Sequence, residues 1–471
     1  MLTRIIVVFI ASTLLLIAST SCKKETILTD SSAKLNFTTD TVLFDTVFTT
    51  VGSITKHFKI LNTHNQPLNI SNIDLSGGTS SEFRINIDGI SGVSFTDVEI
   101  PANDSLFVFV QVTVDPVGVN TPLIVEDSVI FMTNGNEQKV WLHAWGQDAY
   151  FHNREILDDE TWSVDKPHVI YGYAIVDSCK TLTIDPGVTV YAHNNAVLYV
   201  YKGSLNAVGT PGNEITFRGD RLAPFILSNP DSVSGQWRGI WLRQPKTSNI
   251  EYAEIKNSIV GIQIDTLNAG QFVTLNKVKV NNSLYASIFT QNANVTATNC
   301  LFGNAGSYSG IISIGGTQNF THCTFGNLWS DSERNTPLFA LTDYFVTAGI
   351  TYYRPFVQAN FTNCIMYGPL SNDNELTLDT LGRNDIDNVG NLPPEFHFYN
   401  CLFRTDKTIT DPAYYSNCKR NIDPAFFDPA LWDFHINTGG AENMGLAGTG
   451  ISDDLDGIAR STPSDVGCYE K

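Results

Sequence analysis

Positive charge is scarce in this chain of 471 residues, which has 29 Lys and Arg against 48 Asp and Glu and a formal net charge of −19. Nucleic acids and anionic lipid surfaces attract proteins through concentrated Lys and Arg. The shortage therefore argues against both as partners. An acidic balance of this kind mainly favours solubility.

Apolar residues at helical spacing are also scarce. The chain has 35 Gly and 19 Pro, and its short apolar runs are separated by turn residues, a pattern typical of β-strands joined by turns. A content of 42% hydrophobic against 16% charged residues excludes a mainly disordered chain. We therefore expect an all-β protein of two or three domains.

The usual sequence motifs of catalysis and metal binding are missing as well. The chain has no Ser/His/Asp pattern, no phosphate-binding glycine loop and no Cys-x-x-Cys or zinc-type spacing. His322 and Cys323 are adjacent, but neighbours in a strand point to opposite faces, so this pair would not share a metal. Because these motifs are missing, the sequence gives no reason to expect a cofactor.

Residues 1–21 have the features of a secretory signal, with Arg4 near the start, an apolar run over 5–17 and small residues before Cys22. The apolar run is short for a membrane span. Cys22 resembles the lipidated cysteine of bacterial lipoproteins, although Ser19 stands where that pattern usually has Leu. The alternative is an ordinary signal peptide followed by an incidental cysteine.

The lipoprotein resemblance implies lipid attachment at Cys22 and a polar tether over residues 22–34. Acyl chains would hold the protein on a membrane, since each buried methylene contributes about 0.8 kcal/mol. We therefore expect a lipid-anchored protein of the cell outer membrane, on its periplasmic or its outer face, with that membrane as a partner.

Residues 35–149 alternate apolar and polar side chains in short runs. About seven strands in this length indicate a β-sandwich. The segments 100–105, 114–116 and 144–147 resemble the immunoglobulin-like modules found near the anchors of bacterial surface proteins. The resemblance implies a spacer or interaction domain without catalytic residues.

One short segment recurs through the rest of the chain, with a small residue followed two positions later by a large apolar one. Its copies begin at Tyr252, Lys277, Asn299, His322, Asn363 and Asn400. The steps between copies are 25, 22, 23, 41 and 37 residues. A period near 23 with two longer steps indicates a solenoid that carries insertions.

This repeat, the Asp-Pro-Gly turn at 185–187 and the segment Gly-Gln-Trp-Arg-Gly-Ile at 235–240 together resemble the right-handed parallel β-helix, or pectin-lyase-like, family. The resemblance covers about residues 150–440. It implies that each copy of the repeat is one rung of a solenoid.

The strand periodicity agrees with a solenoid. Residues i and i+2 share a face, so Cys300 and Phe302 point the same way, and stacked rungs would form one column of small and one of large apolar side chains. Four asparagines follow the large position, where left-handed turns are expected: Asn257, Asn282, Asn304 and Asn327.

Seven cysteines remain when Cys22 is set aside, and an odd number excludes complete pairing within one chain. The cysteines of the repeat are interpreted as buried small hydrophobic residues, in preference to disulfide partners. These are Cys300, Cys323, Cys364 and Cys401.

The two long steps contain insertions, where solenoids usually carry their binding surfaces. The first is rich in aromatic residues, and the second spans 370–394. Exposed aromatic rings would stack on sugars or contact a protein partner; the alternative is that they cover the flank of the solenoid. The candidate ligand surface consists of Trp329, Tyr344, Tyr352, Tyr353 and Arg354.

Residues 431–436 are expected to form the last rung, and 441–471 a capping segment. The end of the chain resembles the closing segment of bacterial β-helix proteins. A capping salt bridge of Arg460 is the favoured interpretation; calcium binding is the alternative, although a full calcium loop is missing. The candidate calcium ligands are Asp453, Asp454 and Asp456.

The family resemblance also raises polysaccharide lyase and glycoside hydrolase chemistry. A hydrolase needs paired carboxylates, and a lyase needs a cation held by carboxylates plus a basic residue. Asp265 is the lone acid near the matching position of one central rung, and we expect it to be solvated. The leading hypothesis is a non-catalytic lipoprotein whose β-helix presents a scaffold or binding surface to glycan or envelope protein; the alternative is a lyase or hydrolase with its site in the insertions.

Overall fold

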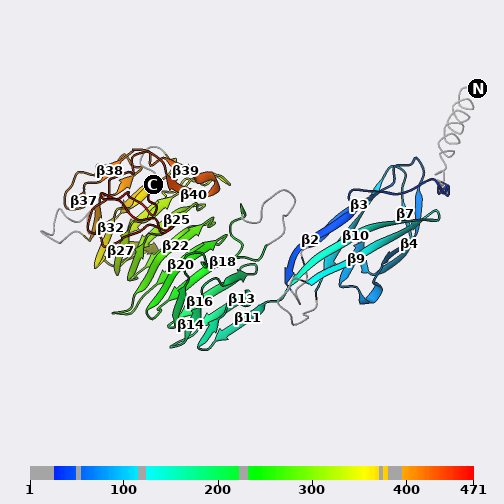
Figure 1. Cartoon of the computed structure of the whole chain (residues 1–471), viewed down its shortest axis with the longest axis horizontal. Helices are drawn as coiled ribbons and strands as arrows, with labels where there is room; N and C mark the ends of the chain where they lie inside the picture. Colours follow the sequence, from blue (N-terminus) through cyan, green and yellow to red (C-terminus); the bar gives the residue numbers. More distant parts are fainter. Residues whose placement is uncertain are drawn as a thin grey trace, which may run out of the picture. The chain divides into compact units, whose positions relative to one another are not determined.

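The computed structural model describes residues 26–48, 53, 55–114, 123–221, 232–370, 375–379 and 395–471. These form two compact units, whose boundary falls between Asp148 and Ala149 (Figure 1). The predicted signal peptide and Cys22 lie outside the described residues. Within the described part, no helix has the length and apolarity to cross a membrane.

The first unit is a sandwich of two five-stranded sheets. One sheet has the order β1 (Asn36–Phe37), β3 (Lys56–Leu61), β8 (Ser105–Val112), β5 (Phe83–Ile87), β6 (Ile90–Gly92). The other has the order β2 (Thr41–Phe48), β10 (Asn136–Gln147), β9 (Leu123–Thr133), β4 (Leu68–Leu75), β7 (Ser94–Ile100). Neighbouring strands are antiparallel except β2 and β10. A short 3-10 turn, η1 (Gly78–Ser80), follows β4.

The sandwich core follows from strict alternation along the strands. In β8, Val108, Val110 and Val112 are fully buried, whereas Phe107 and Phe109 between them are exposed. Two inner faces of this kind interdigitate into one core. The sequence predicted about seven strands, and the described residues of this unit contain ten, because strands of two or three residues such as β1 and β6 carry too few side chains to show a period.

The expected tether over 22–34 is shorter in the structure. Leu28 donates its backbone N–H to the Pro67 carbonyl at 2.8 Å and packs against the core, and Ala33 is buried. From Thr26 onward the chain therefore belongs to the sandwich.

The second unit is a parallel β-helix, which confirms the predicted fold class. Its sheet of 26 strands runs from β11 to β38, and the strands stack side by side along the unit (Figure 1). Pairings such as β13 with β16, β14 with β17 and β15 with β18 give coils with three faces. Face A contains β11 (Tyr150–Leu157), β13 (His168–Val176), β16 (Val197–Tyr201), β19 (Gly239–Arg243), β21 (Val260–Asp265), β23 (Ala286–Gln291), β26 (Tyr308–Ser313), β29 (Phe339–Thr342) and β34 (Leu376–Asp379).

The other two faces are continuous with face A. Face B contains β12 (Glu160–Trp162), β14 (Thr181–Ile184), β17 (Ser204–Val208), β20 (Ser248–Lys256), β22 (Val273–Asn281), β24 (Val295–Thr298), β27 (Thr317–Thr321), β32 (Gln358–Thr362), β35 (Phe396–Tyr399) and β37 (Tyr415–Ser416). Face C contains the first halves of β11 and β13, whose second halves lie on face A, and the second halves of β20 and β22. Its other strands are β15 (Thr189–Ala192), β18 (Ile215–Gly219), β25 (Leu301–Gly303), β28 (Thr324–Gly326), β33 (Ile365–Tyr367), β36 (Leu402–Phe403) and β38 (Lys419–Arg420).

The strand register confirms the repeat. The small positions lie in one buried column on face C: Ile215, Ala253, Val278, Cys300, Cys323, Cys364 and Cys401. The large positions form the neighbouring column: Phe217, Ile255, Val280, Phe302, Phe325, Met366 and Phe403. Cys418, which sequence analysis did not assign to a rung, continues the first column.

The rung cysteines are unpaired, as predicted. Adjacent strands lie about 4.8 Å apart with parallel side chains, whereas a disulfide needs its Cβ atoms about 3.8 Å apart. Each thiol contacts a backbone carbonyl instead, as Cys300 does at Thr298 (3.2 Å). Burial raises the pKa of the Cys323 thiol well above its ordinary value, so it packs as a neutral group.

A second set of turns precedes the cysteine column and was missed in the sequence. Seven residues in equivalent positions have a left-handed backbone: Tyr252, Lys277, Asn299, His322, Asn363, Asn400 and Asn417. We call them the corner column. Of the four predicted turn asparagines, Asn257, Asn282 and Asn304 also have positive φ, whereas Asn327 is outside that group. Asn tolerates this conformation better than other residues with a Cβ.

Residues 441–471, the C-terminal strap, lie along the corner column. The Asn400 amide donates to the Met444 carbonyl (2.8 Å), and Asn363 exchanges two hydrogen bonds with the backbone of Leu446 (3.2 and 2.7 Å). The predicted salt bridge of Arg460 is present, with a buried Glu470 carboxylate 3.2 Å away.

Further contacts fix the strap to earlier rungs. Arg460 donates to the side-chain oxygen of Asn299 (2.7 Å), and Lys277 forms an ion pair with Asp453 (2.6 Å). The strap therefore fastens the flank of several successive coils.

The expected last rung at 431–436 is wrong. β40 (Asp433–Ile436) pairs antiparallel with β39 (Phe426–Asp428), around a 3-10 turn η3 (Pro429–Leu431), and β38 is the last strand of the large sheet. Phe434 is buried against the outer side of Gly303 and Gly326, where added Cβ atoms would meet its ring. The missing side chains of these glycines create the seat for this aromatic residue.

A histidine near the strap lies between two carboxylates. His435 contacts Asp433 through Nδ1 and Asp456 through Nε2 (2.7 Å), and its ring stacks on Tyr469. Lys279 of β22 lies 3.1 Å from Asp456. The hydrogen bond to Asp456, supported by Asp433, raises the pKa of His435 against the opposing effect of burial. The same contact lowers the pKa of Asp456 to about 2.

We predict that Cys323→Leu destabilises the β-helix by about 1–3 kcal/mol, because the closed column has no room for a larger side chain. Cys323→Ala should cost only about 1 kcal/mol. Chemical unfolding followed by circular dichroism measures both free energies. An equal loss in the two variants would contradict a tightly packed column.

We predict that His435→Gln destabilises the protein in a pH-dependent way. Because the folded state raises the pKa of His435, its contribution is complete below the ordinary value of about 6.5 and is lost as pH rises through the raised value. Thermal unfolding should therefore show the largest deficit at about pH 5–6 and a small one at about pH 9. Lys279→Gln, the control, should show a deficit that changes little over this range.

Candidate ligand-binding surface

The predicted aromatic surface lies largely on a projecting hairpin. β30 (Tyr344–Thr347) pairs antiparallel with β31 (Ile350–Tyr353), and Tyr344 lies opposite Tyr353. Tyr352 is exposed and stacks on Phe345 at a centroid distance of 5.0 Å. Arg354, also exposed, follows β31 directly.

Trp329 lies in a different loop. It follows β28, is half-buried, and donates its indole N–H to Ser332 (3.0 Å), whereas the hairpin follows β29. The hairpin therefore carries four of the five predicted residues, with Tyr344 and Tyr353 on one face and Tyr352 on the other, and the fifth lies apart. Two other aromatics of this insertion, Phe339 and Phe356, are buried in the solenoid core.

A buried ion pair holds the base of the two insertions. Arg334 donates two hydrogen bonds to Glu375 (2.9 and 2.7 Å), and both side chains are almost inaccessible. Glu375 also accepts the backbone N–H groups of Leu338 and Leu370. With its lone pairs used in this way, the carboxylate has a structural role. Most of the second insertion, 371–374 and 380–394, lies outside the described residues.

The candidate calcium ligands do not converge on one point. Asp453 pairs with Lys277, and Asp456 pairs with Lys279 and His435. Within the described residues, no group of three or more His, Cys, Asp or Glu side chains has an arrangement suited to a metal ion.

Asp454 is fully buried. It accepts the backbone N–H groups of Asp456, Ile458 and Glu470 at 2.7–3.0 Å. Its carboxylate therefore organises the strap backbone.

A second aromatic surface, missed in the sequence, lies on face A. Tyr199 of β16 and Trp241 of β19 occupy equivalent outward positions on adjacent rungs, with ring centroids 4.9 Å apart. Tyr201 stacks beside Tyr199 at 6.1 Å. All three rings are half-buried. They lie on the outer side of the sheet, because the alternate residues, such as Leu198 and Val200, point into the core. We call these three rings the aromatic stripe.

Asp265, at the end of β21, lies beside the aromatic stripe. Its carboxylate accepts the indole N–H of Trp241 (2.6 Å) and the amide of Gln263 (3.1 Å), and the residue is only 7% exposed. Burial raises the pKa of Asp265, and the hydrogen bonds from Trp241 and Gln263 and the charge of Arg243 oppose this rise. The expectation of a solvated acid was wrong, because side chains from its own and the preceding rung cover it.

The column through Asp265 shows what this surface offers chemically. Arg243 and Gln291 flank Asp265 on the adjacent rungs. The next carboxylate along the column is Asp379, four strands away or roughly 19 Å. Paired carboxylates in glycosidases lie about 5–10 Å apart. The column therefore provides stacking rings, a cation, amides and a single acid.

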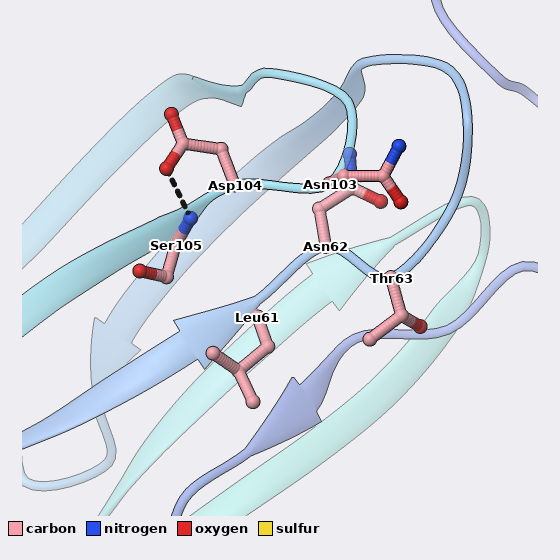
Figure 2. A pocket seen from close by; sticks show the side chains of 6 residues that line it. All are labelled: Leu61, Asn62, Thr63, Asn103, Asp104 and Ser105. Atoms are coloured by element: carbon pink, nitrogen blue, oxygen red, sulfur yellow. Dashed lines mark hydrogen bonds between the residues drawn. The ribbon is translucent and has the colours of Figure 1, made fainter.

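The sandwich has a separate hollow of about 300 Å³. It is lined by Leu61, Asn62, Thr63, Asn103, Asp104 and Ser105, as Figure 2 shows. The Asp104 carboxylate accepts the backbone N–H of Ser105 at 2.7 Å. The buried Asn62 amide donates to three backbone carbonyls, which fixes the loop around the hollow.

Comparison with known proteins gives matches among solved structures alone. No family model and no curated protein sequence matches the chain. Among solved structures, a family 123 glycoside hydrolase from Clostridium perfringens shares 9% identity over 26% of each chain, with a TM-score of 0.18. The chain thus spans about a quarter of that hydrolase.

Two further structures show similarly weak likeness. The PapD-like domain 7 of human CEP192 shares 11% identity over 28% of this chain and 95% of that one, with a TM-score of 0.18. XylC in complex with xylose shares 10% identity over 82% and 78% of the chains, with a TM-score of 0.28. Similarity at this level establishes no shared activity.

Proposed function

We propose that the β-helix binds glycan without cleaving it, through the aromatic stripe on face A, and that the sandwich carries it as the spacer of a lipid-anchored envelope protein. The observation that supports this best is the grouping of Tyr199, Tyr201 and Trp241 beside Asp265. Rings backed by a rigid sheet present their faces without having to reorganise.

The chemistry of this surface suits a sugar ring. A pyranose has apolar C–H faces that pack on aromatic rings and a rim of hydroxyls that need hydrogen-bond partners. Arg243 and Gln291 flank Asp265 on the outward column, and Gln263 lies one alternate position before it. Donors and an acceptor therefore lie next to the rings. The exposed hairpin β30–β31 is the alternative surface, for glycan or an envelope protein.

The anchor is proposed from the sequence. The signal features of residues 1–21 and the position of Cys22 support lipid attachment and retention at the cell outer membrane, on its periplasmic or its outer face. The sandwich begins at Thr26, so the described fold starts only a few residues after this cysteine.

A glycan-cleaving enzyme is the second candidate, and one observation favours it. A buried carboxyl with a raised pKa is the form of acid that protonates a leaving group, and Asp265 has this property. In this case Asp265 would act as the general acid, on face A and away from the insertions.

We predict that Trp241→Ala weakens glycan binding roughly tenfold, corresponding to about 1.4 kcal/mol for the loss of one stacking ring. Tyr352→Ala on the hairpin is the matched control and should leave affinity unchanged. A glycan array followed by calorimetry on the positive glycans measures both. A loss only in Tyr352→Ala would move the site to the hairpin, and release of reducing ends that disappears in Asp265→Asn would favour the enzyme.

We predict that Cys22→Ala abolishes incorporation of labelled palmitate and releases the protein from the membrane fraction. The serine variant at Cys179, an exposed cysteine, is the control and should be labelled normally. Continued labelling of Cys22→Ala would overturn the proposed anchor.

A further inference from the structure

The chain reaches the sandwich very soon after the proposed lipid site. Gln66 donates to the Thr26 hydroxyl (3.0 Å), and the Leu28 N–H donates to the Pro67 carbonyl (2.8 Å). Only four residue steps separate Cys22 from Thr26, and four extended residues span at most about 14 Å. Whatever surface holds the lipid therefore lies close to this part of the sandwich.

The structure shows which end of the sandwich this is. The loop 62–67 and the loop 101–104 meet there, because the Asn103 N–H donates to the His64 carbonyl (3.0 Å). The turn between β9 and β10 lies at the same end, where the Asn136 amide donates to the Ser31 carbonyl (2.8 Å). We call this group of loops the anchor-side end; it includes the hollow in Figure 2.

We infer that the anchor-side end rests against the phospholipid headgroups of the membrane that holds the acyl chains. Its exposed side chains include the uncharged amides Asn65, Gln66 and Asn103, which bring no negative charge to the surface. Gln66 donates to Thr26 (3.0 Å) and Asn103 donates to Asn65 (3.2 Å), and the Asn65 amide can donate to phosphate and ester oxygens. Ile27 is 43% exposed at the point where the chain enters the sandwich. This inference rests on the proposed lipid anchor.

The charge distribution supports this end as the contact. The whole chain has a net charge of −19, so most of its surface would be repelled by anionic lipid. Lys23 and Lys24 stand beside Cys22 in the sequence and favour the membrane locally. The acids at this end include Asp30, Asp104 and Glu137. Asp104 accepts the Ser105 N–H (2.7 Å), and Glu137 pairs with Lys139 (3.1 Å).

The direction of β10 then sets the distance between the membrane and the end of the sandwich at which the second unit begins. This strand of 12 residues starts at Asn136, beside the anchor-side end, and finishes at Gln147, just before the second unit begins. At 3.3 Å per residue its length is roughly 36 Å. The sandwich thus holds the attachment point of the β-helix about that far from the bilayer.

The test uses the full-length lipidated protein in vesicles of phosphatidylethanolamine and phosphatidylglycerol. A fluorophore is placed at Asn65→Cys, on the anchor-side end, or at Thr79→Cys, on η1 at the opposite end of β4, in a background of Cys179→Ser and Cys418→Ser. Lipids with a spin label on the headgroup quench nearby fluorophores. Quenching should be several-fold stronger at position 65 than at position 79.

Each outcome bears on a different part of the argument. Equal quenching at the two positions on vesicle-bound protein would overturn the membrane-facing end and leave the lipid anchor standing. Flotation with vesicles that is no better than for Cys22→Ala would overturn the anchor, and the inference with it. Six Gly and Ser residues inserted between Glu25 and Thr26 should keep flotation and reduce quenching at position 65; unchanged quenching there would contradict a contact set by the short link.

Discussion

The backbone ladder of parallel strands, with adjacent strands about 4.8 Å apart, is the constraint on which the β-helix depends. In this geometry each side chain has the equivalent residue of the next coil as its direct neighbour. Neighbouring positions in a column therefore favour residues of similar size, as Cys300, Cys323 and Cys364 illustrate. The same spacing keeps these thiols apart and unpaired.

The corner column follows from the same constraint. A coil can close only if the chain turns sharply at fixed places, and the residues before the cysteines adopt positive φ to do so. Four of these residues are asparagines, which meet this backbone need and leave an amide available outside the solenoid core: Asn299, Asn363, Asn400 and Asn417. The strap binds to these amides, as its contacts with Asn363 and Asn400 show. Residues selected for a local turn therefore also attach a segment that is distant in sequence.

Features that repeat along the chain could be predicted from the sequence, whereas features that occur once could not. The rungs, the two columns and the unpaired thiols were predictable because the pattern of Asn299–Phe302 returns several times. The burial of Asp265 beside Trp241 was not predictable, since Trp241 lies 24 residues away and belongs to no repeated motif. Residues 431–436 alternate apolar and polar side chains as a rung does. Phe434 nevertheless packs on the outer side of the solenoid, because Gly303 and Gly326, which are distant in sequence, leave space for its ring.

The strap changes how a solenoid of this kind assembles. Repeat arrays interact only with nearest neighbours, so coils form in sequence as the chain emerges. Here the ion pair of Lys277 with Asp453 joins residues 176 positions apart. The flank of these coils therefore stays uncovered until the final residues have been synthesised, and contacts of such long range slow the last stage of folding. A chain without the strap would have every rung, but the side chains of Asn299, Asn363 and Asn400 would lose their strap partners and face solvent or other chains instead.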